Sequence, residues 1–204
     1  MIIYYTDKYK GGREASHGLL REALTEYTGD SERAGQLVCA MKKGEHGKPY
    51  IDGFSCFSIS HTGGIWAVLI TDRECGLDIQ LGRDCDAASI ARRWFAPADA
   101  QRIEDLYEEN EEAASAEFFR IWTKREALVK AMGSSVYETD LPPVSSGEAE
   151  ADGRNYIMKN IAFPGGACSG EGKDLFAAVC MEGSGASDDI TFCALQQQSK
   201  NERQ

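Results

Sequence analysis

The sequence predicts a mixed α+β fold in two halves, residues 1–105 and 106–204. Two patterns favour this class: short strand-like alternation of apolar and polar residues, and the three- and four-residue spacing of amphipathic helices. Both patterns occur on each side of the division. A chain of 204 residues is also long enough to bury a substantial core.

The first half holds three of the expected strands and most of the expected helices. Strands are expected at 56–60, 65–71 and 76–81, and helices at 18–27, 87–95 and 97–107. Gly29 provides a C-cap for the first helix, and Pro97 suits the first turn of the last one. Residues 61–64, which include two glycines, are expected to form a hairpin turn between the first two strands.

The second half opens with the clearest helix in the chain. It is expected at residues 113–132, closed by Gly133, after an acidic bend or helix surface at 108–112. A loop with at most one short strand is expected at 134–155, because this stretch is rich in Ser, Gly, Pro and acidic residues. Strands are expected at 156–163, 175–181 and 190–194, followed by a frayed polar tail at 196–204.

The composition is acidic, with 33 acidic against 22 basic residues and a net charge of −11. This balance argues against nucleic-acid binding and against a polybasic membrane surface, both of which require clustered Lys and Arg. The longest apolar run, residues 65–70, is too short to span a bilayer, and no signal peptide is visible. We therefore expect a soluble cytoplasmic protein that binds neither nucleic acid nor membrane.

Cysteine usage agrees with a reducing compartment. An odd number of cysteines with no C-x-x-C pair predicts free thiols, and the three histidines fit no zinc-ligand spacing. The seven cysteines are Cys39, Cys56, Cys75, Cys85, Cys168, Cys180 and Cys193.

Two segments place carboxylates where they could bind a metal. In the strand at 76–81, alternation puts Asp78 and Gln80 on one face, although a merely solvated face would give the same pattern. On the helix at 113–132, steps of four join two aromatic residues, Phe118 and Trp122, to Glu126 and then to Lys130.

The stripe on the helix has two interpretations. An ordinary surface pair between Glu126 and Lys130 would be weak, at about 0.3–0.5 kcal/mol. Alternatively, Glu126 is held at the edge of the core, where it can bind a metal or accept a proton. Together with Asp78 and Gln80 it would then offer the oxygen ligands that suit Mg²⁺.

Residues 57–64, Phe-Ser-Ile-Ser-His-Thr-Gly-Gly, offer hydroxyls, an imidazole and backbone N–H groups at one bend. Such a bend is a reasonable phosphate cradle. A hydrolase with a Ser60–His61 pair is less favoured, because adjacent strand residues point to opposite faces and no acidic partner is evident. Lys48, in Gly47-Lys48-Pro49, marks only a turn when taken alone.

In this order the motifs resemble one family. Gly-Lys-Pro, Phe-Ser-Ile-Ser-His-Thr-Gly, Gly-Leu-Asp-Ile-Gln and Trp-Thr-Lys-Arg-Glu-Ala-Leu-Val-Lys-Ala-Met-Gly, between residues 47 and 133, are similar to the motifs of Sfp-type 4′-phosphopantetheinyl transferases. The resemblance implies a pseudo-dimer of two similar α+β halves with the active site in the cleft between them. It also implies transfer of 4′-phosphopantetheine from coenzyme A to a serine of an apo acyl or peptidyl carrier protein, with release of 3′,5′-ADP.

The resemblance further implies roles for individual residues. Asp78 and Glu126, with Gln80 at the third position, would hold Mg²⁺ against the coenzyme A pyrophosphate. The expected catalytic residues are Glu126 as general base, Lys130 against the charge on the leaving phosphate, and His61. The residues expected to bind coenzyme A are Lys48, Ser60, His61, Lys130 and Arg13.

The chain departs from the family at three points. The position of Gln80 is often glutamate in this family, so the metal site carries one negative charge fewer. The basic residues that grip the 3′-phosphate have no clear match, and the candidates are Lys8, Lys10, Arg13 and Arg21. Carrier proteins are typically acidic, as this chain is, so docking requires a local apolar or basic patch.

Two other functions compete with transfer. The first is a Mg²⁺-dependent hydrolase of a nucleotide pyrophosphate, although such enzymes usually have denser acidic clusters. The second is a catalytically silent binder of coenzyme A or of a carrier protein. A pseudo-dimer within one chain makes a monomer the expected state.

Overall fold

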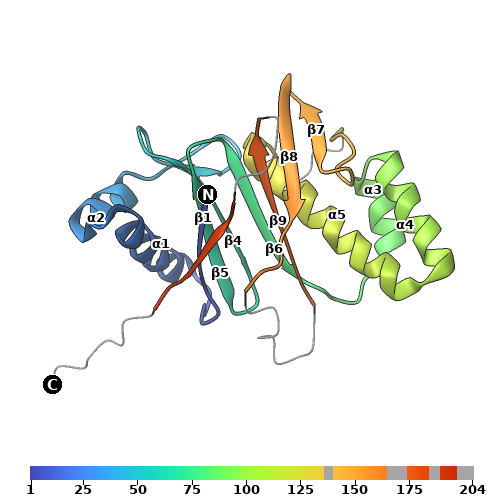
Figure 1. The fold of residues 1–204 in the computed structure, drawn as a ribbon, viewed down its shortest axis with the longest axis horizontal. Helices are drawn as coiled ribbons and strands as arrows, with labels where there is room; N and C mark the ends of the chain where they lie inside the picture. Colours follow the sequence, from blue (N-terminus) through green and yellow to red (C-terminus); the bar gives the residue numbers. More distant parts are fainter. Residues whose placement is uncertain (136–139, 165–173, 184–188, 197–204) are drawn as a thin grey trace.

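The computed structural model describes residues 1–135, 140–164, 174–183 and 189–196. It confirms a mixed α+β fold, with two four-stranded sheets between two groups of helices (Figure 1). Helices α1 and α2 cover the outer face of the first sheet, and α5 covers the outer face of the second, with α3 and α4 packed on the far side of α5. Apolar residues of the two inner faces pack between the sheets, among them Ile3, Leu69, Leu77, Ile79 and Val179.

The first sheet has the strand order β10-β1-β5-β4. Its strands are β1 (Ile2–Thr6), β4 (Cys56–Thr62), β5 (Ile65–Thr71) and β10 (Thr191–Ala194). The helices against it are α1 (Arg13–Thr28) and α2 (Ser31–Ala40), and a short hairpin of β2 (Lys42–Lys43) and β3 (Pro49–Tyr50) follows them. The predicted hairpin between β4 and β5 is confirmed, with Gly63 in its turn at φ +54°.

The second sheet has the order β6-β9-β8-β7 and is antiparallel throughout. Its strands are β6 (Cys75–Leu81), β7 (Glu148–Ala151), β8 (Arg154–Asn160) and β9 (Leu175–Glu182). Helix α5 (Glu111–Met132) packs against this sheet, and α3 (Ala87–Trp94) and α4 (Pro97–Glu109) pack against α5. Gly133, at φ +68°, ends α5 as the sequence predicts.

Strands β4 and β6 lie side by side where the two sheets meet, yet they belong to different sheets. The hydroxyls on every second residue of β4 accept hydrogen bonds from the backbone N–H groups of every second residue of β6. Ser58 Oγ accepts from Leu77 N at 3.0 Å, Ser60 Oγ from Ile79 N at 3.1 Å, and Thr62 Oγ1 from Leu81 N at 3.2 Å. We call these three contacts the hydroxyl seam. It satisfies N–H groups that an edge strand would otherwise leave unpaired.

Strand pairing crosses the expected division at residue 105 in both sheets. Strand β6 precedes that boundary but pairs with β9, and α3 and α4 pack with α5. The first sheet therefore ends with β5 and the second begins with β6, while β10 returns to pair with β1 in parallel. Local patterns located the elements, but strand pairing, which is non-local, decides where the chain divides.

Four elements of the first half were not predicted: α2, β1 and the two-residue strands β2 and β3. Helix α2 buries only Ala34 and contains a glycine, so it has little apolar periodicity. Its signal is the N-cap Asp30, whose carboxylate accepts hydrogen bonds from Glu32 N and Arg33 N. Strand β1 is a five-residue run at the start of the sequence.

The loop expected at residues 134–155 is packed rather than open. Leu141 and Val144 are buried, and the carboxylate of Asp99 in α4 accepts hydrogen bonds from Val144 N and Ser145 N. The single strand allowed for in this stretch is β7. Most of the tail expected at 196–204 lies outside the described residues.

Free thiols are confirmed for six cysteines, and Cys168 lies outside the described residues. Cys75 and Cys180 are buried, and burial raises the pKa of Cys75 to about 12, so this thiol is unreactive.

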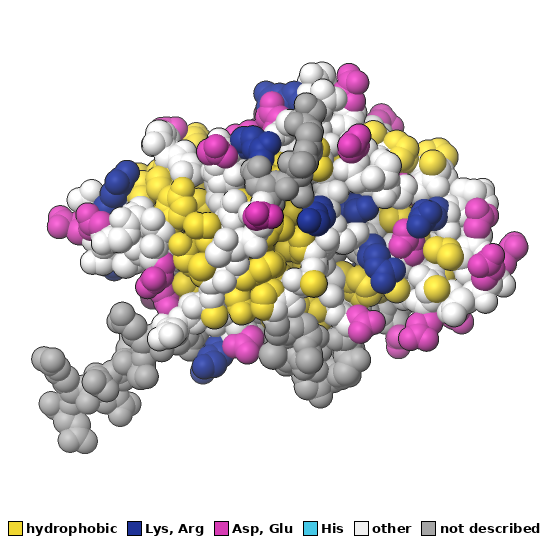
Figure 2. Space-filling view, viewed as in Figure 1, with side chains coloured by type: hydrophobic (Ala, Val, Ile, Leu, Met, Phe, Trp, Pro, Cys, Tyr) yellow, Lys and Arg dark blue, Asp and Glu magenta, His cyan; other side chains and the backbone are white. Residues whose placement is uncertain are grey.

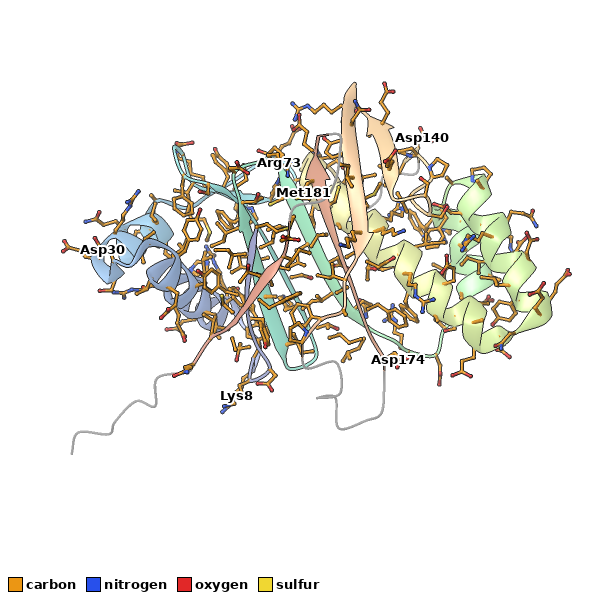
Figure 3. The ribbon with its side chains drawn as sticks, viewed as in Figure 1. Lys8, Asp30, Arg73, Asp140, Asp174 and Met181 are labelled. Carbon is orange, nitrogen blue, oxygen red and sulfur yellow. The ribbon has the colours of Figure 1, made fainter. Side chains whose placement is uncertain are left out.

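At the same end of the sheets, Arg73 Nη2 lies 4.0 Å from Met181 Sδ (Figure 3). No helix of the described ranges is long and apolar enough to cross a membrane.

Helix α5 lies unusually close to β6 at Gly76. A Cβ added there would sit 1.8 Å from the Ala127 carbonyl oxygen and 2.8 Å from Ala131 N. We therefore expect Gly76→Ala to lower the free energy of unfolding by about 3 kcal/mol or more, because helix and strand must separate.

Gly18→Ala is the matched control, because no atom lies within 4 Å of the added Cβ in α1. It should raise the stability by up to about 1 kcal/mol through helix propensity. Urea unfolding followed by circular dichroism measures both changes. Equal stability of Gly76→Ala and the unmodified protein would contradict the close packing.

Candidate active site

The ammonium of Lys130 binds three acceptors at the junction of the two sheets. Its Nζ donates to Asp78 Oδ1 at 2.7 Å, to the Leu77 carbonyl oxygen at 3.0 Å and to Ser60 Oγ at 3.1 Å. Lys130 belongs to α5, Asp78 and Leu77 to β6, and Ser60 to β4, so one cation joins a helix and both sheets. Asp78 is only 7% exposed, which makes this a largely buried ion pair.

The backbone positions both charges. Lys130 lies in the last turn of α5, where the helix dipole favours a cation. Asp78 lies two residues beyond Gly76, on the strand face that α5 approaches, while Leu77 and Ile79 face the core between the sheets. The predicted alternation of β6 is therefore confirmed, and its polar face is covered by α5 rather than solvated.

Glu126 is separated from this ion pair, although it shares the Lys130 stripe of α5. No ion pair joins Glu126 to Lys130, and its carboxylate accepts no hydrogen bond from any residue of the described ranges. Burial, and then the charge of Asp78, raise the pKa of Glu126 above its ordinary value, against the opposing effects of Lys130 and Arg125. The aromatic part of the stripe, Phe118 and Trp122, packs in the core.

The oxygens left open here fit a hard cation. Both hydrogen bonds to Asp78 go to Oδ1, so within the described part of the chain Oδ2 accepts none. Gln80 uses its amide N–H₂ to bind the Leu81 carbonyl oxygen, at 2.9 Å, which leaves its own oxygen as an acceptor. With Glu126, these are neutral or anionic oxygen donors of the kind that Mg²⁺ prefers.

The acidic cluster is sparse. No group of three His, Cys, Asp or Glu side chains able to hold a metal is found among the described residues. Within the described part of the chain, the candidate site has two carboxylates, Asp78 and Glu126, with Gln80 as a further oxygen donor. Such a site leaves room for water and for phosphate oxygens of a substrate.

His61 and Arg13 meet in a different place. Consecutive residues of β4 point to opposite faces, so Ser60 faces Asp78 while the exposed His61 ring packs against Tyr9, with centroids 5.2 Å apart. His61 and Arg13 line a cavity of about 450 Å³ together with His17 and Lys43. The cavity also includes the start of α1, whose N-cap, Gly12, has no side chain to bind the first N–H groups. Basic side chains beside a helix N-terminus favour an anion.

The other basic candidates lie beside this cavity. Lys8, Lys10 and Arg21 line a neighbouring hollow of about 620 Å³, which shares Tyr9 with the first. The exposed Lys8 follows β1 and points away from both sheets (Figure 3). Of the four candidates for the 3′-phosphate, Arg13 is the one that the structure brings together with His61.

Lys48 lies apart from both groups. Its Nζ donates to Glu74 Oε2 at 2.6 Å and to the Ala131 carbonyl oxygen at 3.0 Å, so it ties the β2–β3 hairpin to the C-terminal end of α5. Glu74 was not singled out in the sequence. The hydroxyl seam was also missed, although hydroxyls at 58, 60 and 62 carry the period of two that marks one face of a strand.

Comparison with known proteins identifies the segment that holds the metal-binding candidates. Residues 74–163 match the model of the 4′-phosphopantetheinyl transferase superfamily. This segment belongs to that superfamily. It contains Asp78, Gln80, Glu126 and Lys130, whereas His61 and Ser60 precede it.

Several curated relatives carry the same family name. The chain is 36% identical over 102 residues to the 4′-phosphopantetheinyl transferase AcpT of Salmonella typhi, covering 48% of this chain and 52% of the relative. It is 29% identical over 140 residues to the 4′-phosphopantetheinyl transferase HetI of a Nostoc species, covering 65% and 56%. It is 30% identical over 97 residues to the 4′-phosphopantetheinyl transferase gsp of Aneurinibacillus migulanus, covering 48% and 39%. The chain thus spans about half the length of the first of these 4′-phosphopantetheinyl transferases.

Replacing Glu126 by Gln should stabilise the metal-free protein at neutral pH. The raised pKa means that ionising Glu126 costs free energy in the folded protein, and this cost develops as pH rises from the unfolded-state pKa through the folded one. In the presence of a chelator, Glu126→Gln should have the higher Tm at pH 7.5 and lose this advantage below pH 4, where the carboxyl is neutral.

Glu112→Gln, at an exposed position in the first turn of the same helix, should lower the stability by at most about 1 kcal/mol at pH 7.5, because the helix dipole favours an acidic side chain there, and should raise the Tm at neither pH. A lower Tm for Glu126→Gln than for this control at pH 7.5 would show that Glu126 has a stabilising partner.

Proposed function

We propose that this chain transfers 4′-phosphopantetheine from coenzyme A to a serine hydroxyl of an apo acyl or peptidyl carrier protein and releases 3′,5′-ADP, in a Mg²⁺-dependent reaction. The observation that carries the proposal is the group formed by Asp78, Lys130 and the unpaired Glu126 within the superfamily segment. The pseudo-dimeric arrangement, with coenzyme A between the two halves, is part of the proposal.

The reaction places two demands on the protein. The serine oxygen attacks the phosphorus next to pantetheine, and the bond from that phosphorus to the oxygen of the second phosphate breaks. Glu126 accepts the serine proton, for which a carboxylate with a raised pKa and no hydrogen-bond partner in the described chain is suited. Lys130 stabilises the negative charge that develops on the leaving 3′,5′-ADP.

Asp78, Gln80 and Glu126 would hold Mg²⁺, which neutralises the pyrophosphate when bound. Asp78 is held on its Oδ1 side by Lys130 and Ser60, so its Oδ2 is presented in a fixed orientation. Gln80 supplies an uncharged oxygen. With two carboxylates and one amide oxygen from the protein, Mg²⁺ would keep coordination positions free for the phosphate oxygens of the substrate.

The phosphates of coenzyme A away from the metal would lie with His61 and Arg13. Their shared cavity, with its uncapped helix start, supports this assignment. Lys48 is assigned to the 3′-phosphate end with its family counterpart, and binding there would require its Nζ to leave Glu74 or the Ala131 carbonyl oxygen.

The carrier protein must approach a molecule of net charge −11. In the view of Figure 2, acidic side chains gather over α4 at one end and over α2 at the other, while Lys and Arg side chains interrupt the area between. An uneven distribution of this kind allows an acidic carrier to dock away from the acidic ends. A monomer with cytoplasmic carriers as partners completes the proposal.

An intact-mass assay tests the function. The protein is incubated with coenzyme A, Mg²⁺ and a panel of apo carrier proteins, and the carriers are weighed. We expect one phosphopantetheine per carrier, no addition in the presence of a chelator, and a rate at least about 100-fold lower for Glu126→Gln. The control Glu112→Gln should retain the rate of the unmodified protein.

The remaining outcomes identify the alternatives. Cleavage of coenzyme A without a carrier would replace the proposal by a pyrophosphate hydrolase. Binding of coenzyme A without cleavage or transfer, over a panel that a known transferase modifies completely, would identify a silent binder.

Gln80→Glu should keep the transfer rate within about tenfold of the original and lower the Mg²⁺ concentration needed for half-maximal rate, because the site gains a negative charge. The rate is measured against Mg²⁺ concentration with the same carrier. Complete loss of transfer would show that Gln80 has a role other than metal binding.

A further inference from the structure

We infer that Ser60 is a positioning residue, which fixes Asp78 and Lys130 relative to each other across the junction of the two sheets. This inference rests on the proposed function for its effect on rate. Its geometric part can be tested without turnover. It gives Ser60 a different role from the phosphate contact that the family resemblance implies.

The first argument is that the Ser60 hydroxyl is saturated. A serine hydroxyl has one donor and two acceptor positions. Ser60 Oγ donates to Asp78 Oδ1 at 3.1 Å and accepts from Lys130 Nζ at 3.1 Å and from Ile79 N at 3.1 Å. A direct contact with a phosphate would require the hydroxyl to give up one of these partners.

The second argument is the surroundings of the three groups. Ser60 is 5% exposed, and Lys130, Asp78 and Ser60 are bonded pairwise, which makes a closed triangle of hydrogen bonds. In a buried setting each of these bonds is stronger than in water, and each restricts the rotamers of the other two side chains. The triangle therefore holds Asp78 with Oδ1 toward Lys130 and Oδ2 turned away.

The third argument comes from Ser58, which makes the neighbouring contact of the hydroxyl seam. Ser58 is also buried, at 3% exposure, and its Oγ accepts from Leu77 N just as Ser60 Oγ accepts from Ile79 N. No hydrogen bond within the described ranges joins Ser58 to Asp78 or Lys130. The two serines thus share one structural role, and Ser60 alone has the additional contacts to the charged pair.

The test compares four variants: Ser60→Ala, Ser58→Ala, Ser60→Thr and Ser60→Val. Ser58→Ala removes a seam hydroxyl without touching the charged pair, so it controls for the structural role. Thr and Val have the same shape but differ in the hydroxyl, and a threonine already occupies the rung at position 62. This second pair keeps the test decisive if Ser60→Ala fails to fold.

The first measurement is the rate at which acetic anhydride labels the Lys130 amine, read by peptide mass spectrometry. It needs no substrate. Ser60→Ala and Ser60→Val should label Lys130 about tenfold faster than the unmodified protein, because the amine loses an acceptor and Asp78 loses a donor. Ser58→Ala and Ser60→Thr should stay within about twofold. Equal labelling in Ser60→Ala and Ser58→Ala, or in Ser60→Val and Ser60→Thr, would overturn the inference.

The second measurement is the kinetics of transfer to a carrier protein. Loss of positioning should lower kcat about tenfold or more and leave KM for coenzyme A within about threefold in Ser60→Ala, with recovery in Ser60→Thr. A phosphate ligand would instead raise KM, and that result would overturn the inference. If the unmodified protein transfers nothing, the proposed function fails, while the labelling rates still decide the positioning role.

Discussion

The contact between α5 and β6 at Gly76 is the constraint on which the candidate site depends. Without a side chain at this point, the helix backbone lies against the strand at Ala127 and Ala131, and Lys130, next to Ala131, meets the polar face of β6. A wider separation would give Lys130 and Asp78 room for water between them. The same close approach buries Glu126, whose raised pKa is a consequence of packing rather than of a special sequence.

The charges around this contact are divided unequally. Lys130 is fully engaged and Asp78 is engaged on one oxygen, whereas Glu126 has no neutralising partner in the described chain. An isolated carboxylate near a second one is costly to a folded protein, and the cost is recovered when a cation binds. In the free protein Asp78 therefore has a cationic partner, whereas Glu126 has none among the described residues, although we propose that both bind the same ion.

The sequence predicted the class of fold and most helices and strands, and it placed Asp78 with Gln80 on one strand face and Glu126 with Lys130 on one helix stripe, because alternation and helical spacing are local properties. It could not show that Lys130 pairs with Asp78 rather than with Glu126, because that choice depends on how α5 crosses β6. Strand alternation correctly put Ser60 and His61 on opposite faces of β4. It could not show that Ser60 contacts Asp78, because β4 and β6 are joined by hydrogen bonds of side-chain hydroxyls rather than by a backbone ladder. The way the chain is shared between the sheets is also non-local, because β9 and β10 return to different sheets.

The return of β10 to the first sheet has a consequence for synthesis on the ribosome. Strand β1 emerges well before its parallel neighbour, residues 191–194, because the rest of both sheets lies between them in the sequence. During this interval one edge of β1 remains open. The nascent chain thus carries an unpaired edge until β10 is made, a state in which strands readily join other chains.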